Sequence, residues 1–312
     1  MNVSFFFEVL IGGLLAGVMY SLVAIGFVLI YKASGVFNFA QGAMVFFAAL
    51  TFVSLVERGV NFWLALAVTL AVMVVLGIAT EKVVLRPLVN QPPITLFMAT
   101  IGLTFVLEGL SQLVWGSQPH GLELGIQDVP MDWLSRSTGM NISQFDVFAS
   151  FIAGILVAAL ALFFQYTRIG RALRAVADDH QAALAVGIPL KHIWAIVWAV
   201  AGFVALVAGL MWGARNGVQY ALTFIALKAL PVLILGGFES VLGAIIGGLI
   251  VGASEKLAEV YLPQMLNAPL TEFFGGAVNL QGIESWFAYV IALLFLLVRP
   301  QGLFGEKIID RV

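Results

Sequence analysis

The chain has 312 residues, of which 62% are hydrophobic and only 10% are charged, and its formal net charge is −2. Soluble domains carry about a quarter charged residues, so this composition excludes an ordinary soluble fold and predicts an integral membrane protein. The small net charge argues against nucleic-acid binding, and the absence of cysteine excludes disulfides and thiol catalysis within the chain.

Nine apolar segments are candidates to span the lipid bilayer, a distance that takes about 20 helical residues. They cover residues 6–30, 44–56, 62–80, 94–115, 147–166, 193–212, 222–235, 241–258 and 286–298. The second, seventh and ninth are short, which is typical of broken or re-entrant helices. The sequence therefore predicts an all-α integral membrane protein, a polytopic helical bundle of about eight to ten spans. We expect one transmembrane domain over residues 1–312.

The distribution of Lys and Arg predicts the orientation, because cytoplasmic loops are enriched in both. Nine of the fifteen basic residues fall on one side of the predicted bundle and four on the other. The richer side includes residues 168–191 and the tail from Arg299, so we expect a cytoplasmic C-terminus. Two long acidic loops, residues 116–146 and 259–285, are predicted to form solvated caps on the opposite side.

A polar interruption separates the first two segments. The stretch GVFNFAQGAM, residues 35–44, places Asn38, Gln41 and Gly42 between two apolar runs. Irregular backbone at membrane depth is tolerated where it is buried in protein or lines a cavity. We therefore predict a broken helix whose Asn38 and Gln41 satisfy freed backbone groups or line a pathway; the alternative is a structural turn. Residues 235–251 repeat part of this layout, which indicates a weak internal repeat.

Thr100, Thr104 and Glu108 recur at intervals of four residues in the fourth segment. This spacing places them on one face of a helix. Polar groups are costly in hydrocarbon and usually face a bundle interior, so we predict that this face looks inward and lines a pathway. Two simpler interpretations stay open. The threonines can bond to carbonyl groups of their own helix, and Glu108 can lie at the outer boundary, where exposure costs little.

Residues 166–193 predict a surface helix between the fifth and sixth segments. Its basic residues recur at every third position, at Arg168, Arg171 and Arg174. Its apolar residues form a loose set, namely Leu173, Ala177, Leu184 and Val186. We predict a cytoplasmic amphipathic helix over about residues 168–187, ended by Gly187 and Pro189. Composition alone leaves open a docking surface, basic residues that meet anionic lipid, or a solvated loop helix.

Two charged residues accompany the seventh segment. Lys228 lies within an apolar run before Pro231, and a long basic side chain near a helix end usually extends to the membrane interface. Glu239 lies in LGGFES, a turn between segments, where a solvated or capping role is ordinary. Both are also candidate pathway residues, because ionisable groups at membrane depth often mark one.

Sequence signatures of enzymes are absent. The chain has no G-x-x-x-x-G-K-[S/T] phosphate loop, no H-E-x-x-H motif and no acidic or histidine cluster with metal-ligand spacing. His120, His180 and His192 lie in or beside predicted loops, where histidine is more often solvated than catalytic. We therefore predict no catalytic residues, no metal site and no cofactor in this chain.

Five sequence blocks together resemble a known family. They are GVMYSLVAIGFVLIYKASGVFNFAQGAMVF, LRPLVNQPPITLFMATIGLTFVLEGL, TRIGRALRAVADDHQAALAVGI, LGGFESVLGAIIGGLIVG and LLVRPQGLFG. In this order they are similar to the LivH-like permease subunit of ATP-binding-cassette (ABC) importers of branched-chain amino acids. The likeness covers nearly the whole chain and rests on the agreement of all five blocks.

The resemblance implies several partners in the bacterial inner membrane. A LivM-like paralogous permease subunit would complete the pathway, two cytoplasmic ATPase subunits would drive it, and a periplasmic substrate-binding protein would deliver the amino acid. It also implies that residues 168–187 form the coupling helix that docks on an ATPase. QAALAVG keeps the Glu-Ala-Ala-x-x-x-Gly spacing of importer permeases, with Gln181 in place of Glu. The implied coupling residues are Arg168, Gly170, Arg171, Arg174, Gln181, Ala182, Ala183 and Gly187.

The resemblance also frames the mechanism and the alternatives. Short glycine-rich segments are candidate hinges of alternating access, chosen by location only: Gly12, Gly35, Gly42, Gly236 and Gly237. Relatives of this type carry urea, short amides or other amino acids, and a related ABC family carries sugars. A different class would be an ion-gradient-driven secondary carrier or channel, which would need Glu108 or Glu239 to handle protons.

Overall fold

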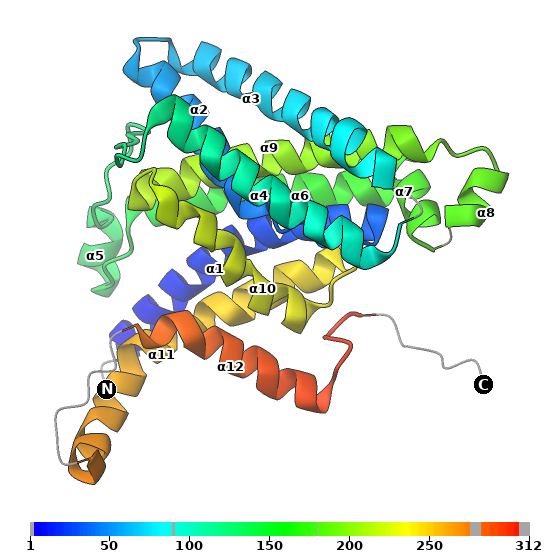
Figure 1. The fold of residues 1–312 in the computed structure, drawn as a ribbon. Coiled ribbons are helices and arrows are strands. Elements are labelled where there is room, and N and C mark those ends of the chain that lie inside the picture. The colour runs from blue at the N-terminus through cyan, green and yellow to red at the C-terminus, as the bar shows by residue number, and fades with distance from the viewer. Residues whose placement is uncertain (1–2, 89–90, 179, 275–281, 306–312) are drawn as a thin grey trace. The chain divides into compact units, whose positions relative to one another are not determined.

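The computed structural model describes residues 3–88, 91–178, 180–274 and 282–305. The chain divides into two compact units. Figure 1 labels the helices of which they are composed. Unit 1 comprises Met1–Ser21, Ile126–Gly154 and Lys228–Val312. Unit 2 comprises Leu22–Gly125 and Ile155–Leu227. Helices α1 (Val3–Ser34), α6 (Gln144–Tyr166) and α10 (Ile225–Gly236) each contribute to both units.

Six helices in the described part of the chain are long and apolar enough to cross a membrane. They are Val3–Ser34, Phe62–Leu88, Ile94–Trp115, Gln144–Tyr166, His192–Asn216 and Val241–Asn267. Three shorter apolar helices cover Gln41–Glu57, Tyr220–Gly236 and Trp286–Val298. Each of the nine overlaps one predicted segment, and the three shorter ones are the segments predicted to be short. The prediction of a polytopic all-α membrane protein is confirmed.

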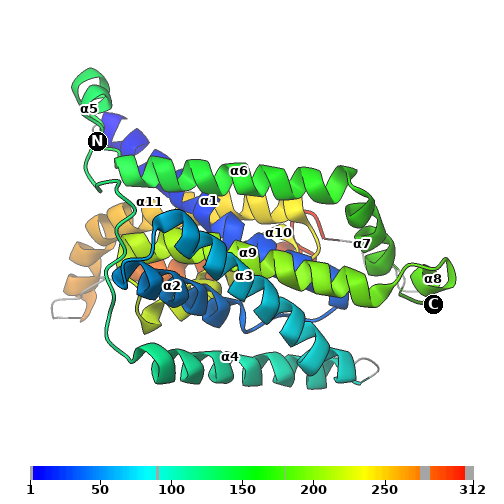
Figure 2. The same cartoon turned by 90° about the horizontal axis from the view of Figure 1, so that it is seen from above.

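Unit 2 is built around helix α2 (Gln41–Glu57). The other complete elements of the unit are α3 (Phe62–Ala79), η1 (Thr80–Leu85), η2 (Arg86–Leu88), α4 (Pro93–Trp115), α7 (Arg168–Asp178), α8 (His180–Ala185), α9 (Leu190–Asn216) and η3 (Tyr220–Phe224). Helix α2 packs against α3, α4, α9 and η3, and Figure 2 shows it beside α3 and α9. Most of its residues are buried, so this short helix is core rather than a lipid-facing span.

Glycines let the helices of unit 2 approach closely. A Cβ atom at Gly77 of α3 would lie 2.5 Å from the carbonyl oxygen of Trp198 in α9. A Cβ at Gly209 of α9 would lie 2.6 Å from the carbonyl oxygen of Val45 in α2. Membrane helices associate through packing rather than a hydrophobic drive, so small residues at such crossings hold α2, α3 and α9 together.

Helix ends in unit 2 follow local sequence. The Asn61 side chain accepts the backbone N–H of Trp63 at 2.9 Å and caps α3. At its other end, α3 continues into a π-helical turn, η1, in which buried Glu81 forms a two-point ion pair with Arg86. The Nε–Oε1 and Nη2–Oε2 distances are 3.0 Å and 2.7 Å. The basic end of the third segment is therefore helical and is held by this ion pair.

Unit 1 contains the first part of α1, α5 (Asp132–Thr138), the first part of α6, most of α10, α11 (Val241–Phe274) and α12 (Ile283–Val298). Helices α1 and α11 cross at glycines. A Cβ at Gly13 would lie 2.7 Å from the carbonyl oxygen of Gly252, and one at Gly17 would lie 2.5 Å from that of Gly248. The expectation that a loop begins at residue 259 is wrong, because α11 continues to Phe274 through two internal prolines.

Candidate pathway and coupling surface

A polar break separates α1 from α2 within unit 2. Gly35 has a φ of +68°, a left-handed conformation that glycine adopts without steric cost, and it follows the last residue of α1. Asn38 and Gln41 are both 0% exposed. Oδ1 of Asn38 accepts the backbone N–H of Ala40 at 3.1 Å, and its Nδ2 donates to Oε1 of Gln41 at 3.2 Å. The predicted broken helix is present, and Asn38 satisfies one of its freed backbone groups.

Thr100 connects this break to helix α4. Its Oγ1 accepts the backbone N–H of Phe39 at 3.3 Å. The same hydroxyl can donate to the carbonyl oxygen of Phe97 at 2.9 Å or of Phe37 at 3.2 Å. Thr104 instead bonds to the carbonyl oxygen of Thr100 at 3.0 Å, inside its own helix. The predicted polar face is therefore divided: Thr100 bonds to the break, and Thr104 follows the simpler interpretation.

Protein atoms fill the surroundings of the break. Phenylalanine rings lie 4.7 Å and 4.8 Å apart in two pairs, Phe27 with Phe37 and Phe39 with Phe97. The Nε2 atom of Gln41 has no hydrogen-bond partner among the described residues. It faces α1 at Gly26, where an added Cβ would lie 2.6 Å from Nε2. The geometry explains the conformation of the break, and the pathway role of Asn38 and Gln41 stays a prediction.

Glu108 of α4 is paired with Tyr220 of η3. The Tyr220 hydroxyl donates to Oε2 of Glu108 at 3.2 Å, and Glu108 is 8% exposed. This burial contradicts the interpretation that Glu108 is an exposed carboxylate at the outer boundary. Close by in the same unit, a Cβ at Gly42 would collide with the carbonyl oxygen of Thr223, so α2 and η3 meet at their backbones.

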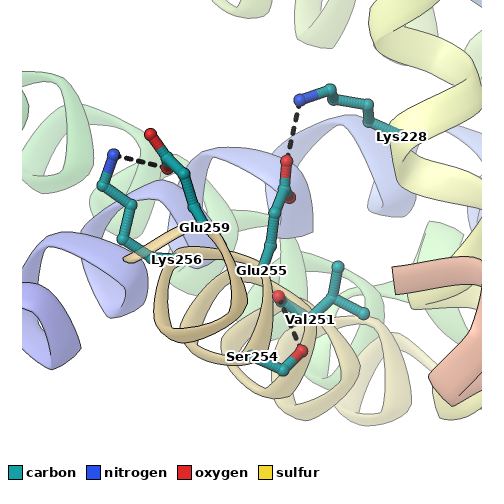
Figure 3. Close-up of polar contacts among 6 residues, drawn as sticks. All are labelled: Lys228, Val251, Ser254, Glu255, Lys256 and Glu259. Carbon is teal, nitrogen blue, oxygen red and sulfur yellow. Dashed lines mark hydrogen bonds and ion pairs between the residues drawn. The ribbon is translucent and has the colours of Figure 1, made fainter. Parts of the chain in front are cut away.

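An ion pair joins α10 and α11 within unit 1 (Figure 3). Nζ of Lys228 lies 2.7 Å from Oε1 of Glu255, and the two side chains are 36% and 9% exposed. The same Nζ lies 5.9 Å from the ring centroid of Tyr20 in α1. Lys228, in the first turn of α10, therefore pairs with a residue in the middle of α11. Glu255 is absent from the predicted set, although an acidic residue inside the eighth apolar segment is itself a signal.

Glu239 occupies the turn between α10 and α11 and is half-buried. The cap of α11 comes from its neighbour, because Oγ of Ser240 accepts the backbone N–H of Gly243 at 2.9 Å. Ser240 thus caps α11, and both the capping and the pathway role of Glu239 stay predictions.

The C-terminal segment completes this turn. The backbone N–H of Leu303 donates to the carbonyl oxygen of Leu235 at 2.7 Å. That of Phe304 donates to the carbonyl oxygen of Gly236 at 3.1 Å. Two orphan carbonyl groups at the end of α10 are therefore satisfied by a remote stretch of backbone.

The five predicted hinge glycines fall into two groups. Among the described residues, Gly12 and Gly35 have no atom within 4 Å of an added Cβ. Gly42, Gly236 and Gly237 each face backbone atoms of another segment at close range. Motion at the second group requires those contacts to separate, whereas the first group is free of such contacts. A hinge role for all five stays a prediction.

The basic stretch forms two helices, α7 and α8, rather than the single helix predicted, and residue 179 between them lies outside the described residues. Both pack against α9. Gly187, with a φ of +84°, and Pro189 separate α8 from α9, as expected. The predicted apolar set is correct at buried Leu173 and wrong at Val186, which is 76% exposed.

Part of this basic stretch binds the C-terminal end of α6. Arg174 donates to the carbonyl oxygens of Phe164 and, at 3.1 Å, Gln165. Gly170 lies against the backbone of Phe164, where a Cβ would collide. Basic side chains at a helix C-terminus satisfy its last carbonyls and oppose its negative dipole end. Arg174 and Gly170 therefore shape the α6–α7 turn, and their contact with an ATPase stays a prediction.

The remaining predicted coupling residues differ in accessibility. Ala183 is buried at 2% exposure. The side chain of Gln181 lies outside the described residues. The exposed side chains on α7, on α8 and directly after it include Arg168, Arg171, Ala182, Ala185 and Val186. Basic and apolar groups thus share one accessible stretch that is anchored on α9.

The chain as a whole matches known transport proteins. Residues 9–299 match the family described as the permease component of branched-chain amino acid transport systems, so the chain belongs to that family. It is therefore a multi-pass membrane protein of the transport-permease class. The resemblance inferred from the five sequence blocks is confirmed.

Individual relatives align with most or nearly all of this chain. The high-affinity branched-chain amino acid permease LivH of Salmonella typhimurium is 27% identical over 99% of this chain and 98% of its own length. BraD of Pseudomonas aeruginosa, with the same description, is 26% identical over 98% of each. The ribose import permease RbsC of Escherichia coli is 23% identical over 89% of this chain and 80% of its own length.

Proposed function

We propose that this chain is the permease subunit of an ABC importer that carries branched-chain or other hydrophobic amino acids across the bacterial inner membrane. The observation that carries the proposal is the family match over residues 9–299. LivH and BraD, which are named for this transport, align from end to end with the chain. The nine apolar helices supply a membrane body for such a pathway.

The proposal includes partners that provide energy and specificity. These are a LivM-like permease subunit, two cytoplasmic ATPase subunits and a periplasmic binding protein. The family description as a permease component supports the existence of other components, and the lack of a phosphate loop is consistent with ATP hydrolysis in another chain. The excess of Lys and Arg on one side supports a cytoplasmic C-terminus and cytoplasmic α7 and α8.

Coupling would proceed through unit 2. The exposed groups of α7 and α8 offer the ATPase a docking surface, and both helices pack on α9. Helix α9 in turn packs on α2 and α3 at glycine contacts. Closely packed helices transmit displacement because their interfaces do not deform continuously. Movement of the ATPase subunits would therefore reach α2 and the polar break at its start.

The docking assignment is tested with Arg171→Glu combined with Val186→Asp, both at exposed positions. Buried Ala183 is unsuitable, because a charge there would disturb folding. We expect ATPase subunits to co-purify poorly and ATP-driven amino acid uptake to fall at least about tenfold, the effect of losing one interface hot spot. Arg136→Glu, at an exposed position of α5 on the predicted opposite side, is the control. Normal assembly and uptake in the double variant would contradict the assignment.

Two other functions give distinct results. Uptake by the chain alone in liposomes, driven by a pH gradient without ATP, would indicate a secondary carrier. Competition for uptake by ribose, urea or short amides, without competition by leucine, would indicate a permease for sugars, urea or amides. RbsC, which is named for ribose import, is among the relatives of this chain.

A further inference from the structure

The Lys228–Glu255 pair joins the first turn of α10 to the middle of α11, where Glu255 lies inside the candidate membrane span Val241–Asn267. Glu255 is about 21 Å from the first residue of α11 and about 28 Å from the last, at 1.5 Å per residue. The hydrocarbon core of a bilayer is about 30 Å thick. Neither end of α11 is therefore near the carboxylate, and Lys228 meets it from α10 at 2.7 Å (Figure 3).

Stability is a weak reason to keep two charges at this place. Desolvation of both groups offsets most of their attraction, and replacement of a buried pair by neutral groups of similar volume is often neutral or stabilising. Ionisable residues within membrane segments usually mark a substrate or ion path. The pairing of Lys228 on α10 with Glu255 on α11 is thus explained by a ligand that needs both charges.

We propose that Lys228 and Glu255 form a recognition site for the two charged ends of a zwitterionic amino acid. The inference rests on the proposed function and narrows its substrate class. The substrate α-carboxylate would take the place of Glu255 at Nζ of Lys228, and the substrate α-ammonium would bind the carboxylate that is released. Each charge keeps an opposite partner, so no isolated charge is left in a medium of low dielectric constant.

Two features of the pair fit this exchange. Lys228 is 36% exposed and Glu255 only 9%, so an incoming carboxylate meets the ammonium first. The Tyr20 ring, 5.9 Å from Nζ, attracts that ammonium while it changes partners. When no substrate is bound, Lys228 and Glu255 neutralise each other. Urea and short amides lack both charges and would have to break the pair without replacing it, so the site favours amino acids.

A second pair on the same helix provides a matched control. Lys256 and Glu259 also lie 2.7 Å apart, but they are three residues apart on α11 and are 38% and 43% exposed (Figure 3). Both of its members belong to α11, so the pair joins no second helix, and both side chains are far less buried than Glu255. Removal of their charges therefore measures the effect on uptake of losing an ion pair of α11 that the proposal does not assign to substrate binding.

The experiment uses the complete importer in proteoliposomes, with ATP inside and saturating leucine-loaded binding protein outside. The test variant is Lys228→Met with Glu255→Gln, and the control is Lys256→Met with Glu259→Gln. We expect the test variant to assemble and to melt at or above the wild-type temperature. We expect leucine taken up per ATP hydrolysed to fall about 10- to 100-fold, the worth of one charged hydrogen bond, and to be unchanged in the control.

Two results would overturn the proposal. Uptake equal to that of the control would show that neither charge binds substrate. Loss of assembly or a lower melting temperature together with the loss of uptake would show that the pair is a structural brace. Failure of the wild-type importer to take up any amino acid with ATP would instead refute the proposed function. This failure is seen in the wild-type assay alone, so it cannot be confused with a difference between the variants.

Discussion

Two helix junctions of this chain share a layout in sequence: residues 35–40 between α1 and α2 in unit 2, and residues 237–240 between α10 and α11 in unit 1. Each begins at a glycine with positive φ, Gly35 at +68° and Gly237 at +99°. In the first, the side chains of Asn38 and Thr100 bond to the freed backbone. In the second, the backbone of residues 303–304 bonds to the freed end of α10, and the side chain of Ser240 caps only the start of α11.

The difference shows that a repeated sequence layout predicts where helices break and not how the broken ends are satisfied. Every buried N–H and C=O group at a break needs a partner, but side chain, backbone and water serve equally well. Side-chain partners make the first junction sensitive to the identity of a few polar residues. Backbone partners make the second sensitive to the approach of the C-terminal segment, whatever side chains that segment carries.

The largest effect is expected at the second junction from Gly302→Ala. Gly302 has a φ of +79°, and an added Cβ would lie 2.7 Å from the backbone nitrogen of Gly237. We expect a loss of about 2–5 kcal/mol in unfolding free energy, because left-handed strain adds to a backbone collision. Gly282→Ala is the control: Gly282 has a φ of +82°, and no atom of the described residues lies within 4 Å of an added Cβ, so the loss should be only about 1–2 kcal/mol. Equal losses in denaturant unfolding would mean that the approach of the C-terminal segment contributes nothing.

An intermediate effect is expected at the first junction from Asn38→Ala. The change leaves the N–H of Ala40 and Oε1 of Gln41 buried without partners, and we expect a loss of about 2–3 kcal/mol. Asn61 makes the same bond to the N–H two residues on, at an exposed helix start, so Asn61→Ala should lose only about 1 kcal/mol. Thermal unfolding of the purified variants measures both. A smaller loss for Asn38→Ala than for Asn61→Ala would contradict the side-chain account of the first junction.

The smallest effect is expected from Thr100→Val, which keeps the shape of the side chain and removes the hydroxyl. The N–H of Phe39 then lacks its acceptor, at a cost of about 1–2 kcal/mol. Thr104→Val removes only a bond within α4 and should change stability by less than about 0.5 kcal/mol. Unfolding in the same denaturant compares the two. Indistinguishable variants would mean that α4 does not support the break.

Much of the architecture could be predicted because its causes are local. All nine apolar segments coincide with apolar helices, since a run of apolar residues is costly in water wherever it lies in the chain. The breaks at Gly35 and Gly187 followed from the same local chemistry. The amphipathic pattern at α7 and α8 was predicted less well. Val186 follows the last residue of α8, and beyond the end of a helix the helical period no longer determines which side chains are buried.

The candidate pathway residues were harder to predict because their partners are remote. Glu255 escaped the predicted set, and Lys228 was expected at the interface, although each lies in an apolar segment. Their attraction depends on the register between α10 and α11, which no local pattern records. The pairing of Tyr220 with Glu108, far apart in the chain, is of the same kind.

The sequence by itself determined that the chain is an all-α membrane protein, where its helices run and to which permease family it belongs. Composition and the order of the sequence blocks are properties of the chain itself, and they do not depend on how the helices pack against one another. Only the tertiary structure decided which polar groups bond to one another: Asn38 with its own turn, Thr100 with a neighbouring helix, and Lys228 with Glu255. The physical reason is that a polar group buried away from water must find a partner in space, and the helices must be packed before those partners exist.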